Sequence, residues 1–309
     1  MNNMNCASGY VVVAGGVNVD IGGTAVAKLV AKDSNPGMIH ISMGGVGRNI
    51  AHNMRLLELN VKMLTAIGDD HNGELIKASC DSIGIDLSES LFVEGASSST
   101  YMFINQPDGD MEIAVNDMRI CEELTPAYYA SKMDVINQAE LLIVDANLPA
   151  ESIHYLVENA KVPIFADMVS TIKGVNFVPV LDKIHTIKAN KIEAEMLSGM
   201  TISDDRSLML AAVAIREKGV KNVFISLGAD GMYVAFGNEC SKVPPVKAKV
   251  WNTTGAGDSS MAALAWCHIN GMDPKTAARY ANAAASITIE SFDTISPDMS
   301  IENIIKRLD

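Results

Sequence analysis

Cysteine is scarce in this chain, and no two cysteines form a closely spaced pair. The 309 residues contain five, Cys6, Cys80, Cys121, Cys240 and Cys267, with no Cys-x-x-Cys motif. An odd and scattered set does not favour a zinc site or a disulfide framework, so reduced thiols in a cytoplasmic protein are expected. The six histidines also lack the His-x-x-x-His spacing of a helical metal site.

Positive charge is also in short supply. Lys and Arg total 24 against 37 Asp and Glu, which gives a formal net charge of −13. General binding to nucleic acids or anionic membranes depends on basic patches, so neither partner is expected. No apolar run approaches the roughly 18 residues of a membrane span, and the residues before Tyr10 lack the apolar core of a signal peptide.

Two common nucleotide-binding motifs are missing. No Gly-x-x-x-x-Gly-Lys-[Ser/Thr] loop occurs, so P-loop chemistry has no support in the sequence. No Gly-x-Gly-x-x-Gly follows the first strand-like run, Tyr10–Val13, which weakens the case for a dinucleotide-dependent dehydrogenase.

The most informative segment that is present runs from Asn252 to Asp258, Asn-Thr-Thr-Gly-Ala-Gly-Asp. It is typical of a glycine loop entering a helix, where the backbone N–H groups of Gly255, Ala256 and Gly257 can hold an anion. The carboxylate of Asp258 beside that site could take a proton from a hydroxyl nucleophile. The alternative is a tight turn in which Asp258 caps the helix.

A second glycine-rich segment, Gly44–Asn49, precedes apolar residues at helical spacing and is expected to open an amphipathic helix. Further upstream, an extended segment places the side chains of Asn18 and Asp20 on the same face. The alternative interpretation makes Asn18 and Asp20 turn residues and the glycines a plain helix start.

Strand-like and helix-like stretches alternate along the chain, which predicts one α/β domain, a mostly parallel sheet flanked by helices. The strands are expected at Tyr10–Val13, Val61–Ile67, Leu141–Val144, Val162–Phe165, Ile184–Lys188 and Val223–Leu227, and the helices at Asn72–Ser82, Ala150–Asn159, Leu208–Lys218 and Lys275–Ile289. The exception is Leu91–Val93, Ser99–Asn105 and Met111–Val115, strand-like runs with no helix between them.

Together these segments resemble the ribokinase family of sugar and nucleoside kinases. Gly44, Gly45 and Asn49 match its first signature, and Thr254–Asp258 its second, over a chain that fits from Val11 to about Ile305. The resemblance implies a ribokinase-like domain over residues 1–309, with a small β-sheet lid from about 18–43 and 91–118. It also implies ATP and Mg²⁺ as cofactors, and a homodimer formed through the lid.

The resemblance implies roles for individual residues. Asp258 would be the general base, and Gly255, Ala256 and Gly257 the anion hole. Asn18 and Asp20 would hold ribose hydroxyls. The remaining substrate contacts would lie beside them, at Gly44, Gly45 and Asn49.

On the nucleotide side, Asn190 and Glu193 match the family's Asn-x-x-Glu motif, whose glutamate organises Mg²⁺ through water. The same two residues could equally form a helix capping box. Further nucleotide contacts would come from Ser226, Gly228, Gly231, Gly255, Gly257 and Asn282. Many relatives carry aspartate where this chain has Asn252, which puts activation by a monovalent cation such as K⁺ in doubt.

The acceptor is indicated by Asp33–Gly37 and by Asn116–Met118, which resemble pseudouridine kinases within the family. Ser34 and Asn35 would then face the uracil edge, since a carboxamide offers both a donor and an acceptor. The expected reaction is phosphorylation of the pseudouridine 5′-hydroxyl. Ribose, adenosine or a fructose-type sugar remains an alternative acceptor, and a non-catalytic nucleoside sensor is an alternative of a different class.

Overall fold

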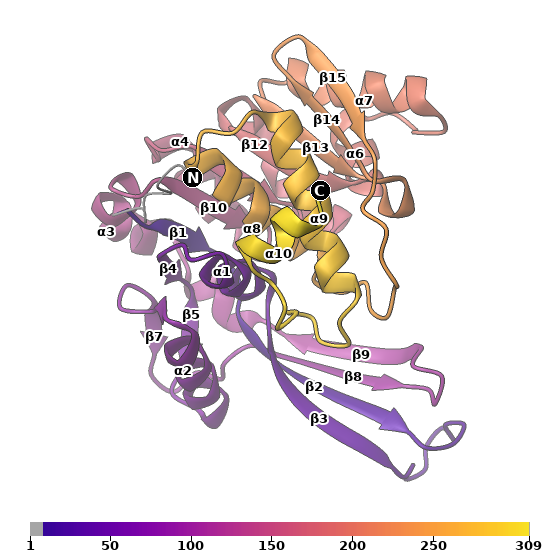
Figure 1. Cartoon of the computed structure of the whole chain (residues 1–309). Helices are drawn as coiled ribbons and strands as arrows, with labels where there is room; N and C mark the ends of the chain where they lie inside the picture. The colour runs from indigo at the N-terminus through magenta and orange to yellow at the C-terminus, as the bar shows by residue number, and fades with distance from the viewer. Residues whose placement is uncertain (1–8, 309) are drawn as a thin grey trace.

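The computed structural model describes residues 9–308, which form a nine-stranded sheet flanked by helices (Figure 1). The strand order is β15-β14-β13-β12-β11-β10-β1-β4-β6, and all pairings are parallel except β13–β14 and β14–β15, which are antiparallel. The predicted α/β class is therefore confirmed. The strands are β1 (Val11–Ala14), β4 (Val61–Leu64), β6 (Ile85–Asp86), β10 (Leu141–Asp145), β11 (Ile164–Asp167), β12 (Thr186–Asn190), β13 (Asn222–Ser226), β14 (Met232–Phe236) and β15 (Glu239–Val243).

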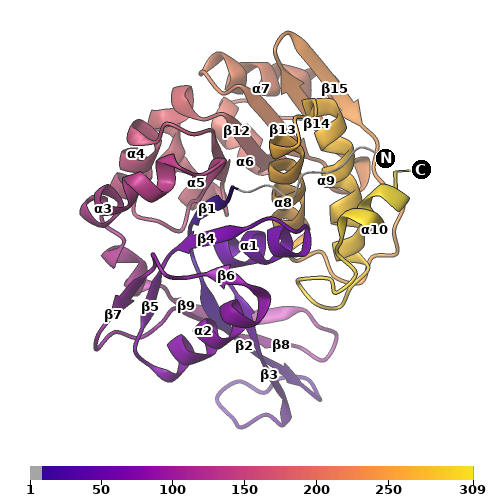
Figure 2. The same ribbon diagram turned by 60° about the vertical axis from the view of Figure 1, so that its left-hand side comes forward.

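Helices cover both faces of this sheet, as Figures 1 and 2 show from two sides. In β1, Val11 and Val13 pack with α1, α8 and α9, whereas Val12 and Ala14 pack with α3, α4, α6 and α7. A strand buried on both faces needs apolar residues at every position, as β1 has. The helices are α1 (Val46–Leu56), α2 (His71–Ile83), α3 (Pro126–Asn137), α4 (Ala150–Asn159), α5 (Thr171–Gly174), α6 (Lys191–Ser198), α7 (Asp205–Glu217), α8 (Ala256–Ile269), α9 (Pro274–Ile289) and α10 (Ile301–Lys306), with 3₁₀ segments η1 (Arg119–Glu123), η2 (Val175–Lys183) and η3 (Gly228–Asp230).

A separate four-stranded sheet, called the small sheet below, projects from the helices and main sheet (Figure 1). Its order is β3 (Gly37–Gly44), β2 (Asn18–Ala25), β8 (Thr100–Asn105) and β9 (Met111–Asp117). The β2–β3 register runs from Asn18 opposite Gly44 to Ala25 opposite Gly37. A turn over residues 107–110 joins β8 to β9 and is closed by a hydrogen bond from Gln106 N to Asp110 O.

Two predictions of how the strands are arranged were wrong. The run Val61–Ile67 is divided at Thr65 into β4 and β5 (Ala66–Gly68), which belong to different sheets. The run Leu91–Val93 forms β7, but it pairs with β5 in a two-stranded sheet and takes no part in the small sheet. The change of sheet occurs at Thr65. The strand β4 before it pairs with β1 in the main sheet, and the Thr65 carbonyl accepts a hydrogen bond from Leu91 N, next to β7, at 2.8 Å.

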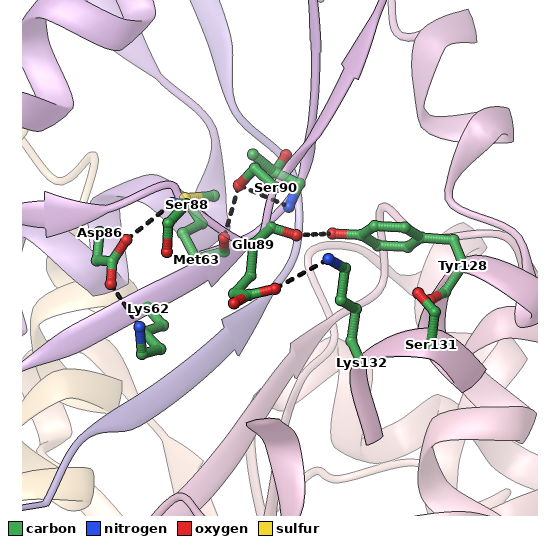
Figure 3. Close-up of polar contacts among 10 residues, drawn as sticks. Lys62, Met63, Asp86, Ser88, Glu89, Ser90, Tyr128, Ser131 and Lys132 are labelled. Atoms are coloured by element: carbon green, nitrogen blue, oxygen red, sulfur yellow. Dashed lines mark hydrogen bonds and ion pairs between the residues drawn. The ribbon is translucent and has the colours of Figure 1, made fainter. Parts of the chain in front are cut away.

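Polar contacts fix the loop that leads from the main sheet to β7 (Figure 3). Lys62 pairs with Asp86 at 2.5 Å, and Ser90 Oγ donates to Met63 O at 2.6 Å. From α3, Tyr128 donates to Glu89 O at 2.7 Å and Lys132 pairs with the Glu89 carboxylate at 2.9 Å. These contacts tie α3 to the edge of the sheet.

Among residues 9–308, no helix is long and apolar enough to cross a membrane. In the same range Cys80, Cys121 and Cys267 are buried free thiols and Cys240 is an exposed one. Cys6 lies outside the described residues.

Candidate active site

The predicted phosphate loop lies close to the carboxyl ends of the central parallel strands. Asp145 ends β10 and is the register neighbour of Asp167, which ends β11 and in turn neighbours Lys188 on β12. Open α/β sheets bind ligands at this edge. Charged side chains of three adjacent strands therefore meet where a ligand is expected.

Helix α8 begins at this edge, as the glycine loop predicts. Its N-cap is Gly255, with φ +82°, and a Cβ there would lie 2.1 Å from Thr294 O. A Cβ on Gly257 would lie 2.8 Å from Lys188 Nζ. The absence of both side chains lets the first turn of α8 approach its surroundings closely.

Asp258, in that first turn, does not cap the helix. Its Oδ2 accepts a hydrogen bond from Asn49 Nδ2 at 3.0 Å, across 209 residues of sequence. Asn49 lies on α1, which Gly44 and Gly45 precede. The two glycine-rich segments that the sequence singled out thus meet at one buried carboxylate.

The electrostatics of this carboxylate suit a base near neutral pH. Burial, reinforced by the neighbouring Asp167, raises the pKa of Asp258 to about 7, while Lys188 and Asn49 oppose the rise. Lys188 Nζ lies 2.8 Å from Asp167 Oδ2. Burial acts to lower the pKa of Lys188, but Asp167 outweighs it with smaller help from Asp258 and Glu193, so the pKa is raised and the ammonium stays charged.

A second carboxylate, Asp20, lies where β2 leaves the main body. Asn18 Nδ2 donates a hydrogen bond to Asp20 Oδ1. A Cβ on Gly44 would lie 2.2 Å from Asp20 Oδ2, and Gly45 has φ +95°. Gly44 therefore lets the end of β3 lie close to the Asp20 carboxylate, whereas Gly45 lets the chain pass close to Gly16, where a Cβ would lie 2.5 Å from Gly16 O. Burial is the main reason that the pKa of Asp20 is raised.

Asn190 and Glu193 form the capping box of α6. Asn190 Oδ1 accepts from Glu193 N at 2.9 Å, and Glu193 Oε2 accepts from Asn190 N at 2.8 Å. Within residues 9–308, no cluster of three acidic, histidine or cysteine side chains could hold a metal. Mg²⁺ keeps several waters and binds substrate phosphates, so it needs few protein ligands. A single buried carboxylate such as Glu193, reached through water, fits that requirement.

The other residues predicted to contact nucleotide gather at the end of β13 and at the segment after β15. Ser226 ends β13, and Gly228, with φ +59°, opens the turn to β14. A Cβ on Gly231 would lie 2.2 Å from Val243 O, and Asn282 Nδ2 donates to Val243 O and to Pro244 O at 3.2 and 2.9 Å. Gly231 and Asn282 therefore both shape the segment after β15.

Two predicted substrate contacts are not brought to the site. The loop that holds Ser34 and Asn35 lies seven register steps along β2–β3 from Asn18, about 23 Å at 3.3 Å per residue. The Asn35 carboxamide accepts from Val30 N at 2.8 Å and donates to Val30 O and Asp33 O, both at 3.0 Å. Ser34 is exposed, and its backbone N–H donates a hydrogen bond to Asp33 Oδ1 at 2.7 Å. Within one chain, this loop therefore lies at the opposite end of β2 and β3 from Asn18 and Gly44.

The carboxamide of Asn252 is also used locally. It donates to Phe292 O at 3.1 Å and accepts from Thr254 N at 2.9 Å. This loop offers K⁺ neither a charge nor a free amide oxygen at Asn252.

Three buried charged residues of the site were not found from the sequence: Asp145, Asp167 and Lys188. Asp145 Oδ2 accepts from Gly16 N at 2.8 Å and Oδ1 from Asn147 N at 2.8 Å, so it fixes both neighbouring loops. The sequence did contain a signal for these three residues. Each is a charged residue near the carboxyl end of a strand-like run, where the side chains of adjacent parallel strands converge.

A family model described as pfkB family carbohydrate kinase matches residues 8–301. The chain belongs to the pfkB family of carbohydrate kinases. It is 36% identical over 302 residues to a pseudouridine kinase of Escherichia coli (strain K12), an alignment that covers 97% of this chain and 96% of the relative.

Solved structures of other kinases share this fold. A Clostridium perfringens protein that carries a provisional sugar-kinase name superposes with a TM-score of 0.88 at 34% identity, over 98% of this chain and 96% of that one. An Arabidopsis thaliana ribokinase complexed with ribose and ATP superposes with a TM-score of 0.85 at 22% identity, over 97% and 99%. The predicted ribokinase-like fold is thereby confirmed.

Proposed function

We propose that this pfkB kinase transfers the γ-phosphoryl group of ATP to the 5′-hydroxyl of pseudouridine. The observation that carries the proposal is the hydrogen bond from Asn49 to Asp258, which joins the sugar-side and phosphate-side segments at one base. A carboxylate with a pKa of about 7 is well matched to proton transfer near neutral pH.

The residues divide the reaction between them. Asn18 and Asp20 hold pentose hydroxyls, with Gly44 and Gly45 keeping the strand above them close. Asp258 accepts the proton of the 5′-hydroxyl while the hydroxyl oxygen forms a bond to the γ-phosphorus of ATP. The bond between the γ-phosphorus and the oxygen that bridges it to the β-phosphate breaks, and ADP leaves.

Backbone N–H groups and the Lys188 ammonium stabilise the negative charge that develops on the transferred phosphoryl group. Gly255, Ala256 and Gly257 supply the N–H groups at the start of α8. Lys188, within reach of Gly257, adds a positive charge beneath them. Mg²⁺ held through water by Glu193 would neutralise the phosphates, and ATP would lie along Ser226, Gly228, Gly231 and Asn282. K⁺ is not included, because Asn252 carries no charge and its amide oxygen already accepts a hydrogen bond from Thr254 N.

Pseudouridine is preferred as the acceptor because of the 36% identity to a pseudouridine kinase over nearly the whole chain. The second candidate is a free sugar, which the provisional name of the Clostridium perfringens structure favours. A coupled assay of ADP release from ATP and Mg²⁺ would compare pseudouridine, uridine, adenosine, ribose and fructose. We expect the highest kcat/KM for pseudouridine, and turnover of ribose alone would overturn the acceptor. Binding of pseudouridine without ADP release from any acceptor would instead favour a sensor.

We further propose that the small sheet is the lid of this site and that two subunits pair through its outer face. Two register rows, Ile41–Ile21–Met102–Val115 and Ile39–Gly23–Ile104–Ile113, lie on the face opposite to Asp20. Ile39, Ile41, Met102, Ile113 and Val115 are between 50% and 77% exposed. A contiguous exposed apolar face of this kind marks an interaction surface.

A further inference from the structure

A hollow of about 670 Å³ lies beside the predicted sugar site, and its lining includes Asn116–Met118, one of the two segments that indicated the acceptor. Its walls come from the end of β9, the loop after β10 and the segment around α5. The polar lining includes Asn116, Glu122, Asn147, Lys173 and Asn176.

The hollow adjoins the position at which Asp20 would hold the pentose. Asp20, Tyr101 and Asn116 are register partners across β2, β8 and β9, so their side chains share one face of the small sheet. At two strand spacings, Asn116 lies about 10 Å from Asp20. A Cβ on Gly16 would lie 3.0 Å from Asn147 Nδ2 and 3.2 Å from Met118 Cε. The hollow and the sugar site are thus parts of one cleft.

Lys173 gives the hollow a positive charge that is not paired with a carboxylate of residues 9–308. Within residues 9–308, Lys173 forms no ion pair. Its Nζ donates to Asn147 Oδ1 at 2.7 Å and approaches Met118 Sδ at 3.8 Å. Asp117, also in the lining, is occupied by Arg119 at 2.6 Å. An ammonium has three N–H donors, so Lys173 keeps at least one for a ligand.

The contact with Lys173 also fixes the orientation of the Asn147 amide. A lysine can only donate, so the atom facing it must be the amide oxygen. The Nδ2 donor is therefore the end directed toward Gly16 and the sugar site. Both side chains present N–H groups to the cleft, which suits an acceptor such as a carbonyl oxygen.

We propose that this hollow is the nucleobase subsite, in which Lys173 and Asn147 bind a carbonyl oxygen next to the glycosidic bond. The inference rests on the proposed function and extends it by naming the substrate class. Pyrimidine nucleosides of the uracil type carry such a carbonyl, whereas adenosine and free pentoses do not. Tyr101, between Asp20 and Asn116 on the same face, adds an aromatic surface for the base.

The test compares Lys173→Met with Lys173→Arg, using Lys183→Met, an exposed lysine outside the cleft, as the matched control. Calorimetry gives the Kd of pseudouridine, and steady-state assays give KM and kcat for pseudouridine and ribose. Loss of a charged hydrogen bond worth about 1.5–3 kcal/mol should raise Kd and KM for pseudouridine roughly 10–150-fold. We expect kcat to change less than KM, the selectivity for pseudouridine over ribose to fall, and Lys173→Arg to keep most of the affinity.

A second variant, Asn147→Asp, keeps the shape of the side chain but replaces the Nδ2 donor by an acceptor. It should also weaken pseudouridine binding, and melting curves of all variants identify any folding defect. A parental Kd in both Lys173→Met and Asn147→Asp, or equal losses for pseudouridine and ribose in folded variants, would overturn the subsite and leave the kinase reaction standing. A parental enzyme that turns over ribose and binds no pseudouridine would overturn both the subsite and the proposed acceptor.

Discussion

The main sheet and the small sheet of this protein differ in how deeply their strands are buried. In β1 of the main sheet, all four residues are buried, and they are fixed by packing on both faces. In β3 of the small sheet, the first six of eight residues are exposed, and only the end next to Gly44 reaches the body of the protein. A segment with few buried contacts opens at lower free-energy cost than a packed core.

The difference separates two parts of the proposed reaction. Asp258, Lys188 and Asp167 lie at the edge of the packed sheet, where their geometry is fixed before any ligand arrives. Asp20 lies where the small sheet joins the body, so the proposed contacts to the acceptor depend on a sheet whose strand β3 is mostly exposed. Substitutions in the main sheet should therefore affect chemistry, and those in the small sheet should affect binding and assembly.

The largest effect is expected for Asp258→Asn. Loss of the general base should lower kcat by roughly 10²–10⁴-fold, the usual range for such catalysis. Nucleotide affinity should change little, because the anion hole is built from backbone. Steady-state kinetics with the most active acceptor measures kcat, and calorimetry measures ATP binding. Near-parental turnover would show that Asp258 is not the base.

The pH dependence of kcat tests the electrostatics of the same edge. Asp258 acts as a base only when it is ionised, so kcat should rise with pH through about 7. Lys188 lowers the pKa of Asp258. The variant Lys188→Met should therefore shift this rise of kcat, the acidic limb of the pH profile, to higher pH. An unchanged limb in a folded Lys188→Met variant would exclude the coupling.

Breaking one half of a buried ion pair also costs about 3–5 kcal/mol of stability. The double variant Lys188→Met, Asp167→Asn supplies the control, because it removes both the charge that lowers the pKa of Asp258 and the charge that raises it. Its acidic limb should return toward the parental position, and thermal melting should show partial recovery of stability.

In the small sheet, Ile113→Lys should disrupt the proposed dimer and leave the fold of the subunit intact. Ile113 is 59% exposed, so its replacement should change the free energy of unfolding by no more than about 0.5 kcal/mol. Sedimentation velocity gives the oligomeric state, and Met209→Lys on α7, 40% exposed, is the matched control. A monomeric parental protein, or a dimer that survives Ile113→Lys, would contradict the interface.

The smallest effect is expected for Asn35→Ala. The lost hydrogen bonds hold an exposed loop, so the free energy of unfolding should fall by no more than about 0.5–1.5 kcal/mol. If Asn35 only holds this loop, kcat/KM should change equally for pseudouridine and ribose. A loss of roughly 2–13-fold confined to pseudouridine would instead support the base contact that the sequence suggested, at about 1.4 kcal/mol per decade.

The features that were predicted correctly from the sequence are those determined by residues close together in the chain. Helix α4 was predicted with its observed bounds, and Asn190 and Glu193 form the expected capping box, because caps and apolar spacing act within a few residues. The partner of β7 was missed, since a three-residue strand carries no signal for the strand with which it pairs. Lys188 was noted as the end of a strand, but its role arises from Asp167 and Gly257, which are distant in sequence.

The hydrogen bond from Asn49 to Asp258 links the proton affinity of the base to the position of the small sheet. Asn49 lies in the first turn of α1, directly after the Gly44–Gly45 junction with β3. A rotation of the small sheet that pulls on this turn would lengthen the bond and remove one of the contacts that hold down the pKa of Asp258.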